Sequence, residues 1–249
     1  MRFKAVEWHE SLPSTNSTLR GLVDGESPAL GGTVIAARGQ TAGRGRGQRQ
    51  WVSAPGKDLT FSFLLRVGER REDLAAIPLV AGLGAAEGLA SLGLGCRLKW
   101  PNDILVGGRK ICGILAEQVA GGPAGGTAII VGMGVNVNMS EAQARQIDRP
   151  ATSILIETGR NLGVEEVLKV VLERVAKWID RWEVEGFGPL IADWAAGSDD
   201  PGREVVVTQS DGSSLAGIFR GLGRQGELLL EDAAGNSHTV WAGDMSPVP

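Results

Sequence analysis

The sequence predicts an α+β protein with a mostly antiparallel sheet, followed by a small all-β unit. Up to about residue 194, strand-like runs are interspersed with two long helical patterns, at 77–92 and 164–182. After residue 202 only short strand-like runs separated by turns remain, as in a small β-barrel. The segment 195–202, AAGSDDPG, has the composition of a linker between these regions. We therefore predict two domains, 1–199 and 200–249.

The strands of the first domain are predicted from runs of apolar residues, alternating or continuous, that are bounded by turn residues. They span 3–8, 33–37, 59–67, 97–100, 104–106, 110–119 and 128–137. Gly107-Gly108 is typical of a hairpin turn, and a glycine-rich turn is expected at 121–126. In the second domain, strands are expected at 204–208, 215–222, 227–231 and 238–241.

The helices are predicted from apolar residues that recur every three or four positions. This period is strongest over 164–182. The helix at 77–92 has Pro78 in its first turn, and its glycines at 82, 84 and 88 indicate close packing against a sheet. A short helix capped by Ser14 or Thr15 follows the first strand, and another is expected at 187–194.

Composition excludes several classes of protein. The formal net charge of −4 argues against a DNA or membrane surface as a partner. No apolar run approaches the roughly 18 residues that span a bilayer, and the N-terminal residues do not form a signal peptide. The only two cysteines in the sequence, Cys96 and Cys112, could form at most one disulfide, which could not hold together a chain of 249 residues. We predict that both are buried core residues. A reducing cytoplasm is the expected compartment.

A basic loop stands out against this acidic background. Residues 39–51, GQTAGRGRGQRQW, contain Arg44, Arg46 and Arg49 and no acidic residue. Glycine backbone can approach an anion closely, and arginine adds planar charged forks that fit carboxylate or phosphate. The loop is therefore a candidate anion-binding segment, with a solvated surface loop as the alternative.

Several mechanisms lack the residues that they need. His9 and His238 are the only histidines, and neither lies near a recognisable serine or cysteine nucleophile. There is no phosphate-binding P-loop motif, no dinucleotide-binding fingerprint and no histidine–cysteine metal cluster in the sequence. The remaining arginines, lysines and amides suit electrostatic stabilisation and positioning, as in nucleotidyl transfer.

Four blocks occur in the order TAGRGRGQRQW, KWPNDILV, RKICGILAE and GMGVNVN. In order and spacing they resemble the biotin–protein ligases (biotin–[acetyl-CoA-carboxylase] ligases), and GIFRGLGRQGELLLE resembles their SH3-like domain. The resemblance implies a mixed, mostly antiparallel sheet with helices on one side, like class II synthetases and lipoate ligases, plus a C-terminal SH3-like β-barrel. It also implies the single-function type, because the chain leaves no room for a DNA-binding helix-turn-helix before the catalytic domain.

A ligase of this kind activates biotin with ATP, accompanied by Mg²⁺, to biotinyl-5′-AMP. It then transfers biotin to a specific lysine of a biotin carboxyl carrier protein. The nearest alternative is a lipoate or octanoate ligase or transferase, against which KWPND and the basic loop argue. An RNA-binding module that uses the loop is a different class. It is disfavoured because no aromatic residue lies between Gly39 and Gln50.

The resemblance assigns residues to three roles. Lys110, Arg46 and Asp103 match catalytic positions, with Lys110 contacting the biotin carboxylate and then the mixed anhydride. Asp103 could orient Lys110, hold Mg²⁺ through water, assist the incoming amine, or simply cap a turn. The positions matching biotin contacts are Ser14, Thr15, Asn16, Gln40, Gly43, Arg44, Gly45, Arg46, Lys110, Gly113, Gly132 and Gly134. Those matching adenylate contacts are Arg44, Arg46, Trp51, Asn102 and Asn136.

The chain departs from the family pattern in one place. The family has a glycine directly before the last arginine of the loop, whereas Gly47-Gln48-Arg49 places it one position earlier. This leaves the backbone path at Gln48 and the role of Arg49 open. The loop is expected to be disordered when empty and to close over the intermediate. The carrier is expected to dock by pairing with an edge strand, and exposed edges would also allow a homodimer.

Overall fold

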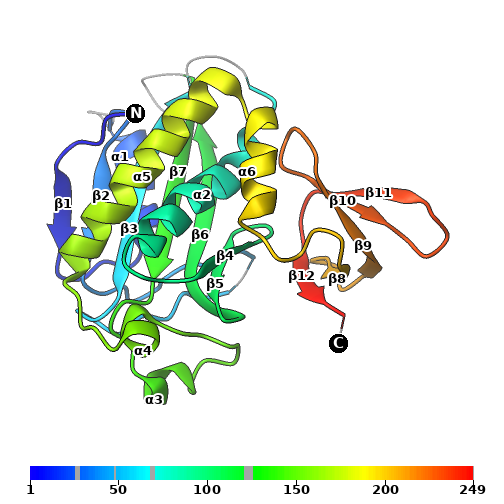
Figure 1. Cartoon of the computed structure of the whole chain (residues 1–249). Helices are drawn as coiled ribbons and strands as arrows, with labels where there is room; N and C mark the ends of the chain where they lie inside the picture. The colour runs from blue at the N-terminus through cyan, green and yellow to red at the C-terminus, as the bar shows by residue number, and fades with distance from the viewer. Residues whose placement is uncertain (26–28, 48, 68–70, 121–125, 249) are drawn as a thin grey trace.

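The structure is a computed structural model that describes residues 1–25, 29–47, 49–67, 71–120 and 126–248. Gln48 lies outside the described residues, and so does the predicted turn at 121–126 except for Gly126. Figure 1 shows a main body built from a central sheet and helices, with a smaller group of strands beside it that ends at the C-terminus.

The central sheet has seven strands in the order β1-β2-β3-β7-β6-β5-β4. Strands β1 and β2 are parallel, and every other neighbouring pair is antiparallel. The prediction of a mixed, mostly antiparallel sheet is therefore confirmed. The strands are β1 (Val6–His9), β2 (Val34–Ala37), β3 (Leu59–Val67), β4 (Cys96–Lys99), β5 (Asp103–Val106), β6 (Arg109–Ala120) and β7 (Thr127–Val135).

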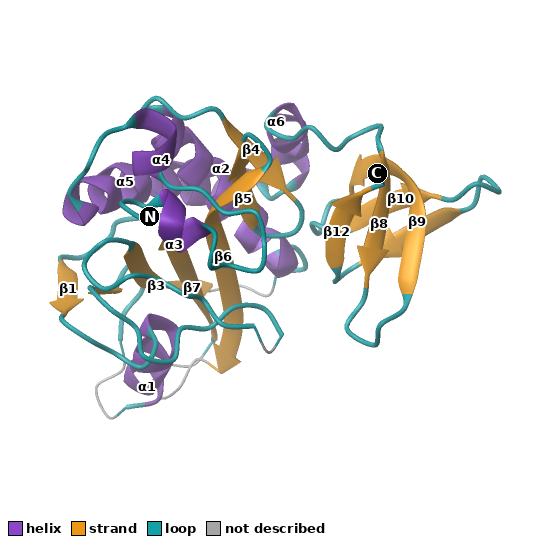
Figure 2. Cartoon of the chain, turned by 90° about the horizontal axis from the view of Figure 1, so that it is seen from below, coloured by secondary structure: helices purple, strands orange, loops and turns teal. Residues whose placement is uncertain are grey.

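Helices cover both faces of this sheet (Figures 1 and 2). The long helices α2 (Ile77–Ala90) and α5 (Val164–Glu185) pack on one face, which carries the larger apolar core. The short helix α1 (Thr15–Asp24) packs Leu19 and Val23 on the other face. Successive side chains of a strand point to opposite faces, so both faces can be apolar. The expected one-sided arrangement holds for the long helices, and α1 adds a second layer.

Two of the three predicted sheet-packing glycines of α2 pack against a helix instead. A Cβ on Gly84 would lie 2.5 Å from Val175 Cα, and one on Gly88 would lie 3.1 Å from Val171 Cα. Both neighbours belong to α5, so these glycines allow two helices to approach each other. Gly82 alone faces the sheet, near Leu98. The prediction of sheet packing was wrong for Gly84 and Gly88, because close helix–helix contact uses the same small residues.

Several short elements follow the sheet. The predicted helix at 187–194 is a 3₁₀ turn, η3 (Gly188–Leu190), followed by α6 (Ile191–Ala196). A second 3₁₀ turn, η1 (Leu74–Ala76), leads into α2. Two helices were not predicted, α3 (Glu141–Ala144) and α4 (Ile154–Thr158). Ser140 and Ser153 cap them by accepting backbone N–H groups, so their signal lies in caps rather than in apolar periodicity.

The two cysteines are free and differ in burial. Cys112 on β6 is fully buried, as predicted. Cys96 lies on the edge strand β4 and is partly exposed, so the prediction of a core position was wrong for this residue. Burial still raises the pKa of the Cys96 thiol to about 12, which makes it a weak nucleophile at neutral pH.

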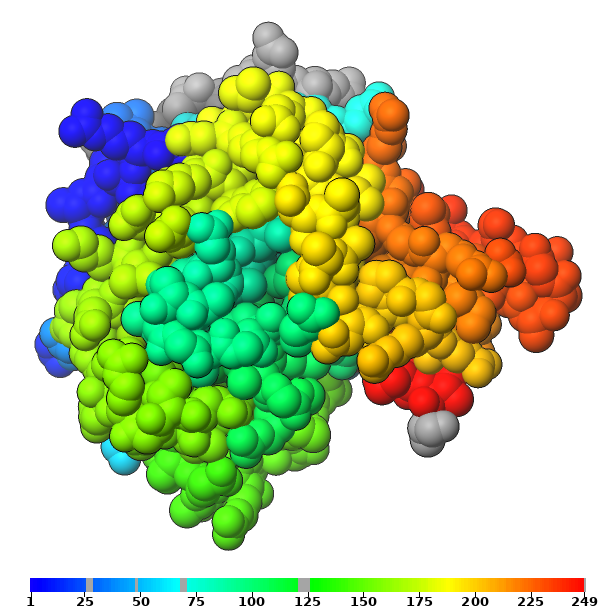
Figure 3. Space-filling view, in the orientation of Figure 1, coloured from blue at the N-terminus to red at the C-terminus, as the bar shows by residue number. Residues whose placement is uncertain are grey.

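The C-terminal strands form a separate antiparallel sheet in the order β11-β10-β9-β8-β12. The strands are β8 (Glu204–Thr208), β9 (Ser214–Leu222), β10 (Leu228–Glu231), β11 (Ser237–Val240) and β12 (Asp244–Pro247). Strand β12 was not predicted. Figure 3 shows this region, coloured orange to red, projecting from the side of the main body. Its buried side chains belong to the same apolar cluster as α2 and α5, so the two sheets are firmly joined.

Candidate active site

Three glycines of β6 and β7 form a bare patch of sheet backbone. Gly113 and Gly134 are direct partners in the register of the two strands. A Cβ on Gly132 would lie 2.0 Å from Asn16 Oδ1, and one on Gly134 would lie 2.2 Å from Trp51 Cε2. A Cβ on Gly113 would lie 2.9 Å from the end of the Lys110 side chain. The glycines are therefore required because the side chains of Asn16, Trp51 and Lys110 lie directly on this patch, which we call the glycine floor (Gly113, Gly132 and Gly134).

Polar side chains at the start of α1 form the first wall. Ser14, Thr15 and Asn16 are all buried although they are polar. The Thr15 backbone N–H donates to Gln40 Oε1 at 2.8 Å. Ser62 Oγ on β3 lies 2.7 Å from Thr15 Oγ1 and 2.6 Å from Asn16 Oδ1. This network fixes hydroxyl and amide groups in one orientation, which is what recognition of a polar ring system requires.

Glu117 on β6 joins this wall to the basic loop, and the sequence interpretation missed it. Asn16 Nδ2 donates to Glu117 Oε2 at 2.8 Å, and the carboxylate also forms ion pairs with Arg20 at 3.1 Å and Arg44 at 2.9 Å. Its side chain is only 14% exposed. Glu117 lies four residues after Gly113 and so on the same face of β6. That spacing is the signal that could have identified it.

Lys110 and Asp103 form the opposite wall. Lys110 Nζ lies 2.6 Å from Asp103 Oδ1 across the β5–β6 hairpin. Asn136 Nδ2 donates to the carbonyl oxygens of Lys110, at 3.3 Å, and Thr152, at 2.9 Å. The buried amide of Asn136 therefore fixes the backbone of Lys110, and the Asp103 carboxylate fixes its side chain.

The arms of the basic loop are hydrogen-bonded to each other. Gly45 N–H donates to the Arg49 carbonyl at 2.8 Å, and Trp51 N–H donates to the Gly43 carbonyl at 3.1 Å. A Cβ on Gly43 would lie 2.4 Å from the Trp51 carbonyl oxygen, so this close approach requires glycine. A cavity of about 200 Å³ lies within the loop and is lined by Ala42, Gly43, Arg44, Gly45, Gly47, Arg49 and Gln50. Backbone N–H groups and guanidinium groups around such a space suit an anion.

The three loop arginines have different side-chain partners. Arg44 reaches Glu117 on the sheet. Arg46 Nη1 lies 3.3 Å from Asn102 Oδ1, and Asn102 in turn donates to the Ile114 carbonyl at 2.6 Å. Burial lowers the pKa of Arg46 and nearby Asp103 opposes that shift, so the guanidinium stays charged. Arg49 pairs with Asp244 of β12.

Trp51 lies on the glycine floor itself. Its ring contacts Gly134 and approaches Gly113, and Lys110 Nζ lies 5.7 Å from the ring centroid. The indole Nε1 is buried and finds no hydrogen-bond partner among the described residues. The resemblance assigns Trp51 to the adenine side and the glycines to biotin. In the structure both sets of residues meet in one place.

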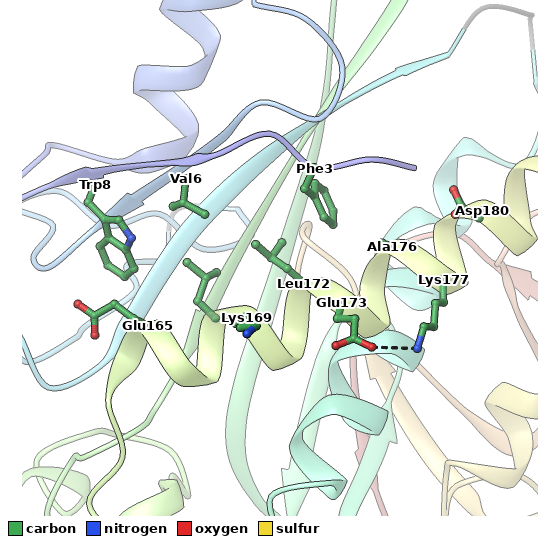
Figure 4. Close-up of a pocket in the computed structure, with 11 residues that line it drawn as sticks. Phe3, Val6, Trp8, Glu165, Lys169, Leu172, Glu173, Ala176, Lys177 and Asp180 are labelled. Carbon is green, nitrogen blue, oxygen red and sulfur yellow. Dashed lines mark hydrogen bonds and ion pairs between the residues drawn. The ribbon is translucent and has the colours of Figure 1, made fainter.

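A larger cavity than the one in the basic loop lies elsewhere. A groove of about 560 Å³ separates the N-terminal segment from α5, and Figure 4 shows the side chains that line it. Its apolar part comes from Phe3, Val6, Trp8, Leu168, Leu172 and Ala176, and Glu173 and Lys177 form an ion pair at its rim. None of the predicted site residues lines this groove. The chemistry therefore belongs at the glycine floor, where these residues gather.

Comparison with known proteins identifies the family. Residues 8–136, which carry most of this site, match the model of the Biotin/lipoate A/B protein ligase family. The chain belongs to this family. It is 34% identical over 219 residues to the biotin–[acetyl-CoA-carboxylase] ligase of Paracoccus denitrificans. The aligned part covers 84% of this chain and 88% of that relative. The corresponding ligase of Mycobacterium tuberculosis is 33% identical over 230 residues, with 87% and 79% covered.

A solved structure agrees over the whole fold. The biotin protein ligase of Aquifex aeolicus, in complex with biotin and ATP, has a TM-score of 0.83 and 31% identity, with 98% of each chain covered. The match includes the C-terminal sheet of this ligase as well as the main body. In the described part of the chain, no helix combines the length and apolarity that crossing a membrane requires.

Proposed function

We propose that this ligase activates biotin with ATP to give biotinyl-5′-AMP and pyrophosphate, and then transfers biotin to a specific lysine of a biotin carboxyl carrier protein. The observation that carries the proposal is the meeting of three cations and a polar wall on one glycine floor. Lys110 on β6 and the two arginines of the basic loop, Arg44 and Arg46, are far apart in sequence, yet all three are anchored around this patch. Ligase relatives at 34% and 33% identity support the substrate.

The polar wall would bind the ureido end of biotin. A ureido ring offers one carbonyl acceptor and two N–H donors, so it needs matched hydroxyl and amide partners. Ser14, Thr15, Asn16 and Gln40 supply these groups. Thr15 is held by hydrogen bonds to Gln40 and Ser62, and Asn16 by one from Ser62. The glycine floor contributes no side chains of its own, so the rest of biotin would lie against sheet backbone beside the Trp51 ring.

In the first step, one biotin carboxylate oxygen attacks the α-phosphorus of ATP and the bond to the pyrophosphate leaving group breaks. Both reactants are anions, so their repulsion must be offset by fixed cations. Lys110 would contact the carboxylate and later the mixed anhydride, and Arg44 and Arg46 would face the phosphate. The ion pair with Asp103 supports an orienting role for that residue, because it holds the Lys110 ammonium in one position.

Mg²⁺ would arrive with ATP. The described residues contain no group of three or more His, Cys, Asp or Glu side chains arranged to hold a metal ion. Mg²⁺ commonly binds to substrate phosphates and one or two carboxylates, so the site fits an ion carried by ATP, with Asp103 as the carboxylate that could hold it through water. Bound there, the ion would supply neutralising charge to the phosphates. Trp51, Asn102 and Asn136 would bind the adenylate side.

In the second step, the uncharged amine of a carrier lysine attacks the carbonyl carbon of biotinyl-5′-AMP, forming the amide and releasing AMP. No residue is assigned as the base for this amine. The chain's own contribution is to position the activated carbonyl and to exclude water from it.

The carrier would dock at a sheet edge. The outer edge of β4 is already used, because Leu98 N–H donates to the Gly197 carbonyl and Arg97 pairs with Asp199. In the described sheet, β1 pairs only with β2, which leaves its other edge for an added strand. The bridge between Leu12 and Gln40 links the end of β1 to the polar wall. A second copy at this edge would form a homodimer, and sedimentation with and without carrier distinguishes the two.

We also propose that residues 1–199 form the catalytic domain and residues 200–249 an SH3-like domain. The boundary is supported by the change from the mixed sheet to a purely antiparallel one that begins at β8. A cytoplasmic location is supported by two cysteines that form no disulfide.

Substrate-dependent pyrophosphate exchange tests the first step. The ligase should exchange labelled pyrophosphate into ATP when biotin is present. Exchange that depends on lipoate or octanoate instead would overturn the proposal in favour of the neighbouring branch of the family.

A further inference from the structure

The basic loop makes direct contacts with the C-terminal sheet. Arg46 Nη1 donates to the Gly243 carbonyl at 3.1 Å. Arg49 forms a two-pronged ion pair with Asp244, in which Nη1 donates to Oδ1 at 2.7 Å and Nη2 pairs with Oδ2. Paired N–H···O contacts of this kind fix direction as well as distance. Strand β12 and the residue before it, some 200 residues away in sequence, thus hold two arginines of the active-site loop.

The C-terminal partner in these contacts is rigid. Gly243 has φ +154°, and a Cβ there would lie 2.4 Å from Val207 Cγ1, so the turn before β12 is pressed against β8. Met245 is buried directly after Asp244. The sheet itself is tied to the main body, because Trp100 Nε1 donates to the Gly226 carbonyl at 3.1 Å. Asp244 is therefore a fixed point to which Arg49 of the loop is attached.

We propose that Asp244 is a positioning residue that latches the arginine–glycine loop over the site through Arg49, so that the C-terminal sheet retains the acyl-adenylate. This inference rests on the proposed function. Asp103, Asp148 and Arg149 also act electrostatically on Arg49, but Asp244 is the residue that forms a two-pronged pair with it. The latch gives Arg49 a role in closing the loop and gives the C-terminal sheet a role in the reaction.

The size of the effect follows from exposure. The side chains of Arg49 and Asp244 are 46% and 35% exposed, so solvent and salt screen the pair. Loss of such a pair shifts an open–closed equilibrium by about three- to fivefold. An open loop lets water reach the mixed anhydride and lets the intermediate escape. Loss of the Arg49–Asp244 pair should therefore shorten the retention of biotinyl-5′-AMP rather than slow its formation.

The test compares three full-length variants with wild type. Asp244→Asn removes the charge of the latch. Glu231→Gln is the matched control, because it breaks the two-pronged pair with Arg220 in the same sheet, at similar exposure and away from the loop. The double variant Arg49→Asp with Asp244→Arg restores the pair with reversed charges. Each protein is loaded with biotin and ATP, and loss of bound biotinyl-5′-AMP is followed by quenching and chromatography.

Asp244→Asn should lose the intermediate about three- to fivefold faster than wild type, with pyrophosphate exchange changed less than about twofold. Glu231→Gln should match wild type, and the charge-swapped variant should recover most of the retention. Raising salt should speed the loss of biotinyl-5′-AMP from wild type more than from Asp244→Asn, which has no latch left to screen.

Equal retention by Asp244→Asn and wild type would overturn the latch, as would loss that is independent of salt in wild type. If Asp244→Asn fails to fold, the latch is tested by retention of biotinyl-5′-AMP in the charge-swapped variant and by the salt dependence of that retention in wild type. Wild type that forms no biotinyl-5′-AMP would refute the proposed function itself, which is a separate outcome.

Discussion

The substitution Gly132→Ala adds a methyl group at a position of β7 where the neighbouring side chain leaves no space for it. The new Cβ would lie 2.0 Å from Asn16 Oδ1, far inside the 3.0 Å below which real Cβ contacts essentially do not occur. Asn16 cannot move freely, because its amide contacts Ser62 Oγ at 2.6 Å and Glu117 Oε2 at 2.8 Å. The substitution must therefore break these contacts or shift β7.

The cost can be worked from these two contacts. A neutral hydrogen bond contributes about 0.5–1.5 kcal/mol net and one to a charged group about 1.5–3 kcal/mol. The free energy of unfolding should therefore fall by about 2–4 kcal/mol, which corresponds to a Tm lower by about 4–16 °C for a chain of this size. Because Asn16 leaves its place in the polar wall, affinity for biotin should fall at least about tenfold, or ~1.4 kcal/mol.

Thermal denaturation and calorimetric titration with biotin measure the two effects. Gly21→Ala is the control, because it lies on α1 with no atom within 4 Å of its new Cβ. Combining Gly132→Ala with Asn16→Ala removes the clash, so the double variant should be about as stable as Asn16→Ala alone, while affinity for biotin stays low. Gly132→Ala with unchanged Tm and unchanged affinity would refute the placement of Asn16 on the glycine floor.

Three further changes test other parts of the site and fold. Lys110→Gln should slow biotin-dependent pyrophosphate exchange by about 10²–10³-fold, because a fixed cation is lost from the transition state, while transfer from supplied biotinyl-5′-AMP falls much less. Glu117→Ala should raise the KM for biotin about tenfold and change kcat little, since it frees Asn16 and Arg44 without touching the reacting atoms. Asp73→Asn tests pH dependence: burial alone would raise the pKa of Asp73, but hydrogen bonds from Arg71 and the Phe187 N–H hold it below its ordinary value of 3.8. Its stabilising effect is therefore present above about pH 4 and is lost as pH falls. The variant should be about 1–3 kcal/mol less stable than wild type in urea at pH 7, with a smaller difference at pH 3.

Each of these has a clear contrary result. Equal losses of exchange and of transfer in Lys110→Gln would show that the residue serves structure or binding in general. A Glu117→Ala variant with a normal KM would separate this carboxylate from the biotin wall. A stability difference for Asp73→Asn that persists unchanged at pH 3 would contradict the lowered pKa.

Local patterns predicted the main elements because those elements have strong periodicity. The strand predicted at 59–67 matches β3, and the helix predicted from residue 164 matches α5 with a few more residues at its end. Strand β12 was missed because its four residues, ending in Pro247, carry no alternation and depend on pairing with β8. The parallel pairing of β1 with β2 also has no local signature, since strand direction is set by how the chain returns to the sheet.

Most residues of the site could be predicted from the sequence, but most contacts between distant residues could not. Lys110 and Asp103 are joined by a hairpin, so their pairing follows from nearby sequence. The contact between Asn16 and Glu117 spans 101 positions, and that between Arg46 and Gly243 spans 197. Only the folded sheets bring such pairs together. Disorder of the empty loop remains a prediction.

The central claim is that this ligase attaches biotin to a carrier lysine. It is tested most directly by mass spectrometry of an apo carrier domain after incubation with the ligase, biotin, ATP and Mg²⁺. We expect a mass gain of one biotinyl group on a single lysine, with AMP released. No biotinylation, together with transfer of a lipoyl or octanoyl group when those acids are supplied, would contradict it.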